Sequence, residues 1–469
     1  MEEKYIRLIE IFKDLSSVPR NSKKEEKIGK YILEFAKKIN LEAYMDGLYN
    51  VIVKRKASLG MENSKKIIFQ AHTDMVCEKS KDSTHDFEND PIDIIVEGEK
   101  MSANGTTLGA DDGIGVATLL LLMEDKELSL PETYFIFTTQ EEIGMNGARA
   151  LDMSNINADY LINLDGEEEN TAIVGCAGGV SIHYNKVTNV EPVEKYLYKL
   201  VISGLYGGHS GVDINKGRIN SNNLAARILE NTNSRIISFI GGNKDNAIPK
   251  YTEVVFENEN NIDEKIGLLL EKLEVSDEDK NIAVDLERLE DMYSNALSLD
   301  ESNNVINFML NLNQNVIKMS QDIENLVETS GNIGIVRIEN GNMHIVESLR
   351  SSIDSEKDRI KNENNKLATS LGFDITEEGE YPGWKYNPSS IIEKIYKKAY
   401  MKSHNGEEPV ICAIHAGVEC GMFYEKMPNL DMISLGPDVV DVHTTNETLY
   451  LESCKRLLST LYIMIENLK

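Results

Sequence analysis

Short apolar runs alternate with helical patterns over the first part of the chain. Four runs are rich in β-branched and aromatic residues and have the length of buried strands. They begin at Asn50, Lys66, Thr133 and Asp159 and read NVIVKR, KIIFQA, TYFIFTT and DYLINLD. The run VATLLLLM, between the second and third of these, is predicted to be a buried helix. This order predicts an α/β fold with a mostly parallel central sheet.

A further helix is predicted shortly after Ser22. Ser22 precedes Glu25 by three residues, and apolar residues follow at helical spacing, among them Ile28 and Ile32. This is the pattern of a capping box, in which a serine side chain accepts an N–H of the first helical turn. We therefore expect the Ser22 hydroxyl to close the N-terminus of this helix.

The pattern changes after residue 186. From there to about residue 380 the chain has longer charged segments and Asn-rich loops, and the α/β pattern returns from residue 381. The simplest interpretation is one domain made of residues 1–186 and 381–469, interrupted by an inserted α+β domain of residues 187–380. A chain of 469 residues is also too long for one compact core, which agrees with two domains.

Composition narrows the classes of partner. The formal net charge of -29 is spread over the whole chain, so phosphate backbones should repel it and no nucleic acid is expected. No apolar run approaches the roughly 20 residues that cross a bilayer, so no membrane is expected either. The N-terminus lacks the basic and then apolar pattern of a signal peptide. The five cysteines form no CxxC pair, and we expect a cytoplasmic protein without a disulfide framework.

Potential metal ligands follow the ends of the predicted strands. In chain order they are His72, Asp74, Asp111, Asp112, Glu141, Glu142 and Asp165. Ligands of open parallel sheets bind beyond the carboxyl ends of the strands, so we expect these side chains to share one site. One histidine with several carboxylates suits divalent zinc, cobalt or manganese. His443, in the turn before the last helix, is a candidate to complete the site.

Two local spacings suggest roles within this site. His72 and Asp74 lie two residues apart on extended backbone and so face the same way. Asp74 is therefore expected to accept the second ring N–H of His72 and to fix its tautomer. Glu141 and Glu142 are adjacent and face opposite ways, so one of them is expected to bind metal while the other faces the substrate as a base. The alternative for this pair is an ordinary solvated turn.

The chain resembles the metallopeptidase clan that includes carboxypeptidase G, peptidase T and aminoacylase. The motifs that carry this resemblance are HTD, GADDG, TTQEEIG, LDGE and a late histidine before TNE. More narrowly, the chain is similar to the aminoacyl-histidine dipeptidases, also called peptidase D or cytosol non-specific dipeptidases. The shared motifs are VPRNSKKEEKI, GLYGGHSGVDINKGRIN, GGNKDNAIP, SLRSSIDS, YPGW and IHAGVECGMF. The resemblance extends from near Val18 to the last helix.

The resemblance implies a zinc-peptidase-like catalytic domain with a pair of divalent ions. Zinc is the expected metal, with cobalt and manganese as alternatives. Asp111 and a water would bridge the two ions. One metal would be held by His72 and Asp165, and the other by Glu142 and His443.

The resemblance also implies the roles of the neighbouring residues. Glu141 would be the general base, and Asp74 would orient the first metal-binding histidine. The peptide bond between Asp111 and Asp112 would be cis. The family commonly has a lysine or similar residue after the paired aspartates, whereas this chain has Gly113.

The same resemblance makes the inserted domain a lid with substrate-binding residues. His209, which lies between glycines, is expected to reach the scissile carbonyl. Asn246 and Arg350 are candidates for binding the oxyanion and the substrate carboxylate, because a guanidinium pairs bidentately with a carboxylate. His415 is expected in the substrate pocket. The alternative for each is a structural role, and Arg350 could instead pair with one of the lid's acids.

The sequence thus predicts metal-assisted hydrolysis of dipeptides, with Xaa-His and a broader set of substrates expected from the resemblance. Small peptides are the expected partners. Two other interpretations stay open: a related amidohydrolase, such as an N-acyl amino acid deacylase or an aminotripeptidase, and a non-catalytic binding protein on the same fold. A monomer suffices if His209 serves its own active site, whereas a homodimer through the lid is required if His209 serves a partner's.

Overall fold

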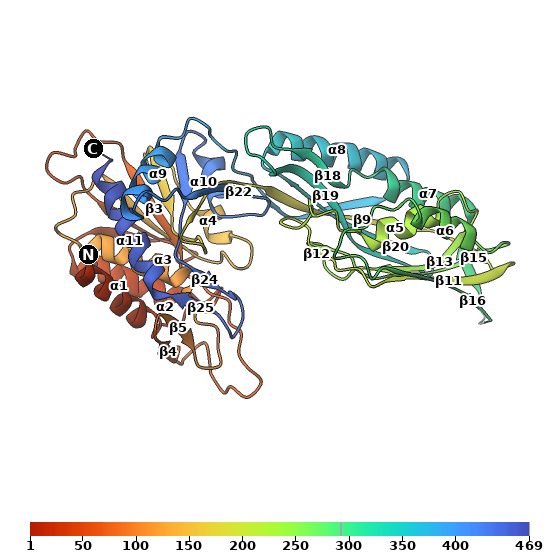
Figure 1. Cartoon of the computed structure of the whole chain (residues 1–469), viewed down its shortest axis with the longest axis horizontal. Coiled ribbons are helices and arrows are strands. Elements are labelled where there is room, and N and C mark those ends of the chain that lie inside the picture. Colours follow the sequence, from red (N-terminus) through yellow and green to blue (C-terminus); the bar gives the residue numbers. More distant parts are fainter. Residues whose placement is uncertain (291–292, 469) are drawn as a thin grey trace. The chain divides into compact units, whose positions relative to one another are not determined.

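The computed structural model describes residues 1–290 and 293–468, and the chain divides into two compact units (Figure 1). The first unit comprises Met1–Gly175, Tyr386–Ala413 and Val418–Lys469, and the second comprises Cys176–Lys385 and Ile414–Gly417. The sequence pattern places the start of the inserted domain at residue 187, whereas the second unit begins at Cys176. The reason is that β9 (Gly178–Val187) pairs with β20 (Asn342–Ser351) and β21 (Asp374–Tyr381) of that unit.

An eight-stranded sheet forms the centre of the first unit. Its order is β1 (Glu42–Met45), β2 (Val51–Arg55), β6 (Thr133–Thr138), β3 (Ile67–His72), β7 (Tyr160–Asn163), β23 (Asp431–Ser434), β8 (Thr171–Cys176) and β22 (Val410–Ile414). β3 runs parallel to β6 and β7, and β7 runs parallel to β23, whereas β1 and β2 add antiparallel strands at one edge. β3, β6 and β7 are buried along their whole length, as expected for strands covered on both faces.

Helices pack around this sheet, and a second, smaller sheet of four strands accompanies it. The helices are α1 (Glu2–Leu15), α2 (Glu26–Lys38), α3 (Ala110–Glu124), α4 (Asn146–Ala150), α9 (Ile391–Ser403), α10 (Cys420–Lys426) and α11 (Leu451–Glu466). The smaller sheet has the order β24 (Val439–Val440), β25 (Thr448–Tyr450), β5 (Lys100–Ala103) and β4 (Ile94–Glu97). α3 contains the apolar run predicted to be a buried helix, and it packs on α1 and β3. None of the described helices combines the length and the apolar character needed to cross a bilayer.

The second unit is built on a nine-stranded sheet with antiparallel pairings. Besides β20, β9 and β21 it contains β16 (Ala283–Leu289), β11 (Tyr196–Ser203), β15 (Thr252–Asn258), β13 (Arg235–Gly241), β19 (Val327–Glu339) and β18 (Asn315–Met319). Two short ladders pair β10 (Val190–Pro192) with β17 (Asn295–Leu297) and β12 (Gly208–His209) with β14 (Ala247–Ile248). The helices are α5 (Ser221–Leu229), α6 (Asp263–Leu270), α7 (Leu299–Asn311) and α8 (Asp354–Ser370).

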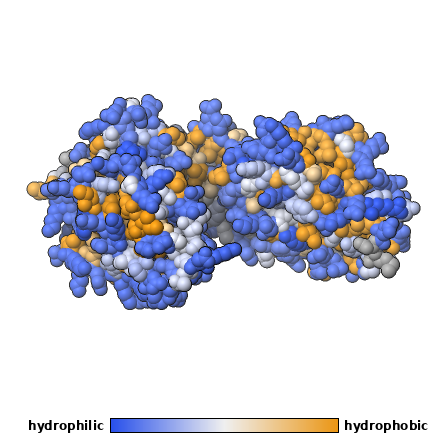
Figure 2. Space-filling model, turned by 60° about the horizontal axis from the view of Figure 1, so that its bottom comes forward, coloured by the Kyte–Doolittle hydropathy of each residue, from blue (hydrophilic) through white to orange (hydrophobic). Residues whose placement is uncertain are grey.

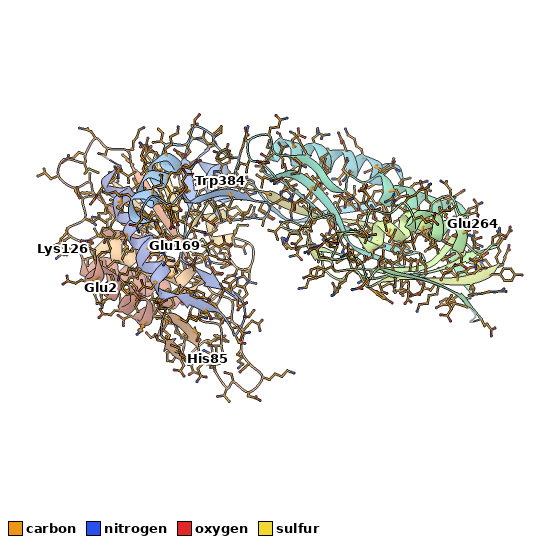
Figure 3. All side chains as sticks on the ribbon, viewed as in Figure 1. Glu2, His85, Lys126, Glu169, Glu264 and Trp384 are labelled. Atoms are coloured by element: carbon orange, nitrogen blue, oxygen red, sulfur yellow. The ribbon has the colours of Figure 1, made fainter. Side chains whose placement is uncertain are left out.

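The core of the second unit joins helix to sheet through aromatic side chains. The ring of Phe308 on α7 lies 5.0 Å from that of Tyr184 on β9 and 4.7 Å from that of Phe373. The chain enters and leaves this unit at neighbouring positions, because Cys176 and Trp384 are joined by two backbone hydrogen bonds of 2.9 Å. Trp384 is labelled in Figure 3. The face shown in Figure 2 is largely hydrophilic, with apolar side chains between polar ones, which agrees with the high content of charged residues.

Candidate metal centre and substrate-binding groups

The potential ligands of the first unit lie beyond the carboxyl ends of its central strands. β3 ends at His72, and the ends of β6 and β7 lead directly into the segments with the paired glutamates and Asp165. Asp111 is in the first turn of α3, and His443 follows β24. Three groups have ligand atoms within 4.8 Å of one another: His72, Asp112 and Asp165; His72, Glu141 and Glu142; and Asp111, Glu142 and His443.

Asp111 lies between the two histidines. Its Oδ1 is 3.1 Å from Nε2 of His72, and its Oδ2 is 3.1 Å from Nε2 of His443. Each histidine also has a carboxylate of its own: His72 Nε2 lies 3.2 Å from Asp165 Oδ1, and His443 Nε2 lies 2.9 Å from Glu142 Oε2. Two ligand sets therefore share Asp111, which is the arrangement that suits two ions bridged by one carboxylate.

Asp112 uses its carboxylate differently from Asp111. Its Oδ2 accepts the backbone N–H of His72 and its Oδ1 accepts that of Gly115, both at 3.1 Å. Asp112 thus holds the end of β3 against the start of α3. The peptide bond between Asp111 and Asp112 is cis, which confirms what the family resemblance implied.

Asp74 connects His72 to the turn that carries the two glutamates. The Nδ1 atom of His72 lies 3.1 Å from the carbonyl oxygen of Asp74 and 3.5 Å from its Oδ1. Either oxygen makes Nδ1 the donor and leaves the Nε2 lone pair directed toward the other ligands. The Asp74 carboxylate also accepts the backbone N–H groups of Glu141 at 3.0 Å and Glu142 at 3.3 Å. One buried aspartate therefore orders both the histidine and the turn.

The capping role predicted for Ser22 is wrong. α2 begins at Glu26 with Glu25 as its N-cap, and no side chain caps it. The Ser22 hydroxyl instead donates to Oδ2 of Asp74 at 2.8 Å. A hydrogen bond to a buried carboxylate is stronger than one to a neutral group, which explains why the hydroxyl lies at the site rather than at the helix end.

Burial and mutual repulsion perturb the acids of this site. Burial raises the pKa of Glu141 well above its usual range, that of Asp165 to about 6 and that of Glu419 to about 8. Hydrogen bonds to two carboxylates raise the pKa of His443 to about 10. Oε1 of Glu142 is buried and has no hydrogen-bond partner among the described residues. Divalent cations would neutralise this concentration of charge and satisfy the unpartnered oxygen.

Two buried glutamates at this site were not assigned a role from the sequence. Glu419 accepts hydrogen bonds from Gln70 Nε2 and Thr138 Oγ1, both at 2.6 Å. Glu447 accepts the backbone N–H groups of the loop before and at Asp111. Both glutamates lie in motifs that carry the family resemblance, but their partners are hundreds of residues away and no local spacing indicates them.

The second unit brings together His209, Arg350 and His415. The Nδ1 atom of His209 accepts the backbone N–H groups of Gly211 at 3.1 Å and Val212 at 3.2 Å, so its proton is on Nε2. Burial, with the positive charge of Arg350 nearby, lowers the pKa of His209 and lowers that of His415 to about 3. Both histidines are therefore neutral at pH 7.

Arg350 is 7% exposed, and among the described residues it forms no ion pair with an acid of the lid. Its NH1 donates to the Tyr381 hydroxyl at 2.7 Å, and its Nε has no hydrogen-bond partner. His415 is also buried, and its Nε2 lies 2.7 Å from Oγ of Ser330. The guanidinium thus keeps unused donors beside two neutral histidines.

Asn246 lies on the loop next to His209. The ladder of β12 and β14 pairs His209 with Ala247, and the carbonyl oxygen of Asn246 accepts the N–H of Ser210 at 2.9 Å. The Asn246 side chain is exposed. The two loops predicted to contact the substrate are therefore joined by backbone hydrogen bonds.

The chain belongs to a known class of hydrolases: residues 68–467 match the peptidase family M20/M25/M40, and the chain is a member of this family. The cytosol non-specific dipeptidase of Escherichia coli is 36% identical over 459 residues, which cover 95% of this chain and 94% of that protein. The crystal structure of aminoacylhistidine dipeptidase from Vibrio alginolyticus matches with a TM-score of 0.92 at 33% identity, covering 98% of this chain and 96% of that one.

A more distant match shows the fold alone. The crystal structure of aminopeptidase PepT from Bacillus cereus has a TM-score of 0.58 at 17% identity and covers 99% of this chain and 98% of that one. These comparisons confirm the family predicted from the sequence motifs and the α/β fold.

Proposed function

We propose that this chain hydrolyses dipeptides, Xaa-His among them, with the help of two divalent metal ions, most simply zinc. The observation that carries the proposal is Asp111, which presents one oxygen to each of two histidines, each with a further carboxylate beside it. The near full-length similarity to a cytosol non-specific dipeptidase supports the choice of dipeptides.

The first unit supplies the metal ligands in this proposal. His72 and Asp165 would hold one ion, Glu142 and His443 would hold the other, and Asp111 would be a ligand of both. When bound, such ions would supply Lewis acidity, which polarises a peptide carbonyl and lowers the pKa of water. The ligand chemistry suits zinc, since imidazole and carboxylate groups bind it and Asp111 offers both of its oxygens.

Glu141 is the general base of the proposed reaction. Its side chain lies in the same cluster as His72 and Glu142, and its backbone N–H is fixed by Asp74. The carboxylate takes the proton of the attacking water and then delivers it to the nitrogen of the leaving amine. Glu142 cannot share this role in the proposal, because its Oε2 faces His443.

The second unit supplies groups that bind the peptide. His209 donates from Nε2 to the oxyanion, because its Nδ1 already accepts two backbone N–H groups. Arg350 binds the terminal carboxylate through donors that no described acid occupies. Asn246 lies on the loop joined to that of His209 and contributes to oxyanion binding, and His415 lines the carboxylate site as a neutral group.

The test is a substrate panel combined with metal analysis. Purified protein should contain about two divalent ions per chain and should cleave Xaa-His and other dipeptides faster than tripeptides or acetyl amino acids. A chelator should abolish turnover, and zinc, cobalt or manganese should restore it. Full activity of metal-free protein would refute the proposal. Preference for acetyl amino acids or tripeptides would instead assign the chain to another amidohydrolase activity, and absence of any turnover in metal-loaded protein would favour a binding protein.

A further inference from the structure

Glu447 binds the backbone of the loop that ends at Asp111. Its side chain is 2% exposed. Oε2 accepts the N–H groups of Leu108 at 2.8 Å and Gly109 at 2.9 Å, and Oε1 accepts those of Ala110 at 2.7 Å and Asp111 at 3.3 Å. Both carboxylate oxygens are thus fully engaged with consecutive peptide groups, an arrangement that fixes the path of this loop.

Arg20 holds the same loop through a carbonyl oxygen. The buried guanidinium donates to the carbonyl oxygen of Gly109 through NH2 and to that of Thr73 through NH1 at 3.3 Å. Space for it is left by Gly113, because a Cβ at that position would lie 2.5 Å from NH2 of Arg20. Glu447 therefore acts on a loop whose carbonyl side is also restrained.

Glu447 also belongs to the segment that carries His443. The N–H of Glu447 donates to the carbonyl oxygen of Thr444 at 3.2 Å, so the two residues are parts of one turn. The same carboxylate therefore ties the turn of His443 to the loop of Asp111. Since Asp111 contacts both His72 and His443, a shift of this loop would disturb both ligand sets.

We propose that Glu447 is a positioning residue for the metal pair, which sets the affinity of both ions by holding Asp111 in register with His443. This inference rests on the proposed two-metal function. A carboxylate suits the task because it offers two oxygens and a negative charge to four N–H groups, whereas an amide offers one oxygen and brings two donors of its own.

The test compares Glu447→Gln with Glu142→Gln in metal titrations of the metal-free chain against a chromophoric chelator. Glu447→Gln should weaken both ions by roughly 10- to 100-fold, the range for residues that orient metal ligands. Glu142→Gln should weaken one ion only. The control is Glu347→Gln, which alters another fully buried carboxylate, in the second unit, and should leave both affinities unchanged.

A second variant keeps the test decisive if Glu447→Gln does not fold. Glu447→Asp keeps the negative charge on a side chain that is shorter by one methylene. It should also lower the affinity for both ions, but by less than Glu447→Gln does. Wild-type affinities for both ions in a folded Glu447→Gln or Glu447→Asp variant would overturn the inference, and so would the loss of only one ion. Failure of the proposed function is distinguishable, because the unaltered chain would then bind no pair of ions.

Discussion

Exchanging Glu141 for glutamine tests the proposed base directly. Glutamine keeps the size of the side chain, and the hydrogen bond that fixes this residue joins its backbone N–H to Asp74, so the turn should keep its shape. Folding and metal content should therefore be unchanged in Glu141→Gln.

Turnover should fall steeply in the same variant, because an amide cannot accept the proton of water. Positioned general bases contribute about 10²- to 10⁴-fold, which corresponds to about 3 to 5 kcal/mol of the activation barrier. Most of this loss should be in kcat, since the base acts in the transition state and not in binding the ground state.

The matched comparison is Glu142→Gln, which changes the adjacent residue in the same way. Oε2 of Glu142 lies 2.9 Å from Nε2 of His443, so this variant should lose affinity for one ion and regain activity at high metal concentration. Both variants should be assayed for metal content and for steady-state hydrolysis of a dipeptide across metal concentrations. Reversed behaviour would exchange the two roles, and two active variants with full metal content would refute the site.

Three other results are expected. His209→Ala should lower kcat strongly at unchanged metal content, as for the loss of an oxyanion donor, and unchanged turnover would leave His209 a structural role. Arg350→Lys should raise KM for dipeptides more than it lowers kcat, because lysine loses the bidentate fork, and an unchanged KM would contradict carboxylate binding. Burial raises the pKa of Glu347 from 4.5 to about 7, so the folded chain retains a proton that the unfolded chain loses. The contribution of Glu347 to the free energy of unfolding is therefore fully present below the pKa of the unfolded chain. It decreases by about 3 kcal/mol as the pH rises through the pKa of the folded chain. Glu347→Gln should reduce the loss of unfolding free energy between pH 5 and pH 8 by about this amount, measured by urea unfolding at both pH values, and an unchanged loss would refute the raised pKa of Glu347.

The strands and the main cluster of candidate ligands could be predicted because each rests on local pattern. β3, β6 and β7 are continuous apolar runs, and parallel strands bring their carboxyl ends to one edge. The position of His72 and Asp165 follows from that geometry alone. His443 was placed there because the α/β pattern returned after the insertion, although its contact with Asp111 depends on the tertiary fold.

The residues behind the ligands could not be predicted, because their partners are backbone groups or distant side chains. An N–H group has no sequence signature, so nothing near Glu447 indicates that its carboxylate binds residues 108–111. For Ser22 the local sequence pattern predicted a helix cap, but the hydroxyl donates instead to the buried carboxylate of Asp74, which is distant in the sequence. The second unit begins earlier in the chain than the sequence pattern indicates, because β9 pairs with β20 and β21, which are more than 150 residues away in the sequence.

The adjacent glutamates after β6 are accommodated by the backbone of their turn. The carbonyl oxygen of Glu141 accepts the N–H groups of Gly144 and Met145, both at 2.9 Å, which closes a tight turn after the strand. The N–H groups on the other side of this turn go to Asp74, so its negative charge is partly balanced by two dipoles before any cation binds. With the backbone held at both sides, Glu142 is directed to His443 while Glu141 stays near His72. An ordinary solvated turn would not direct its carboxylates toward two histidines, and we therefore infer that the two negative charges after β6 belong to the metal site.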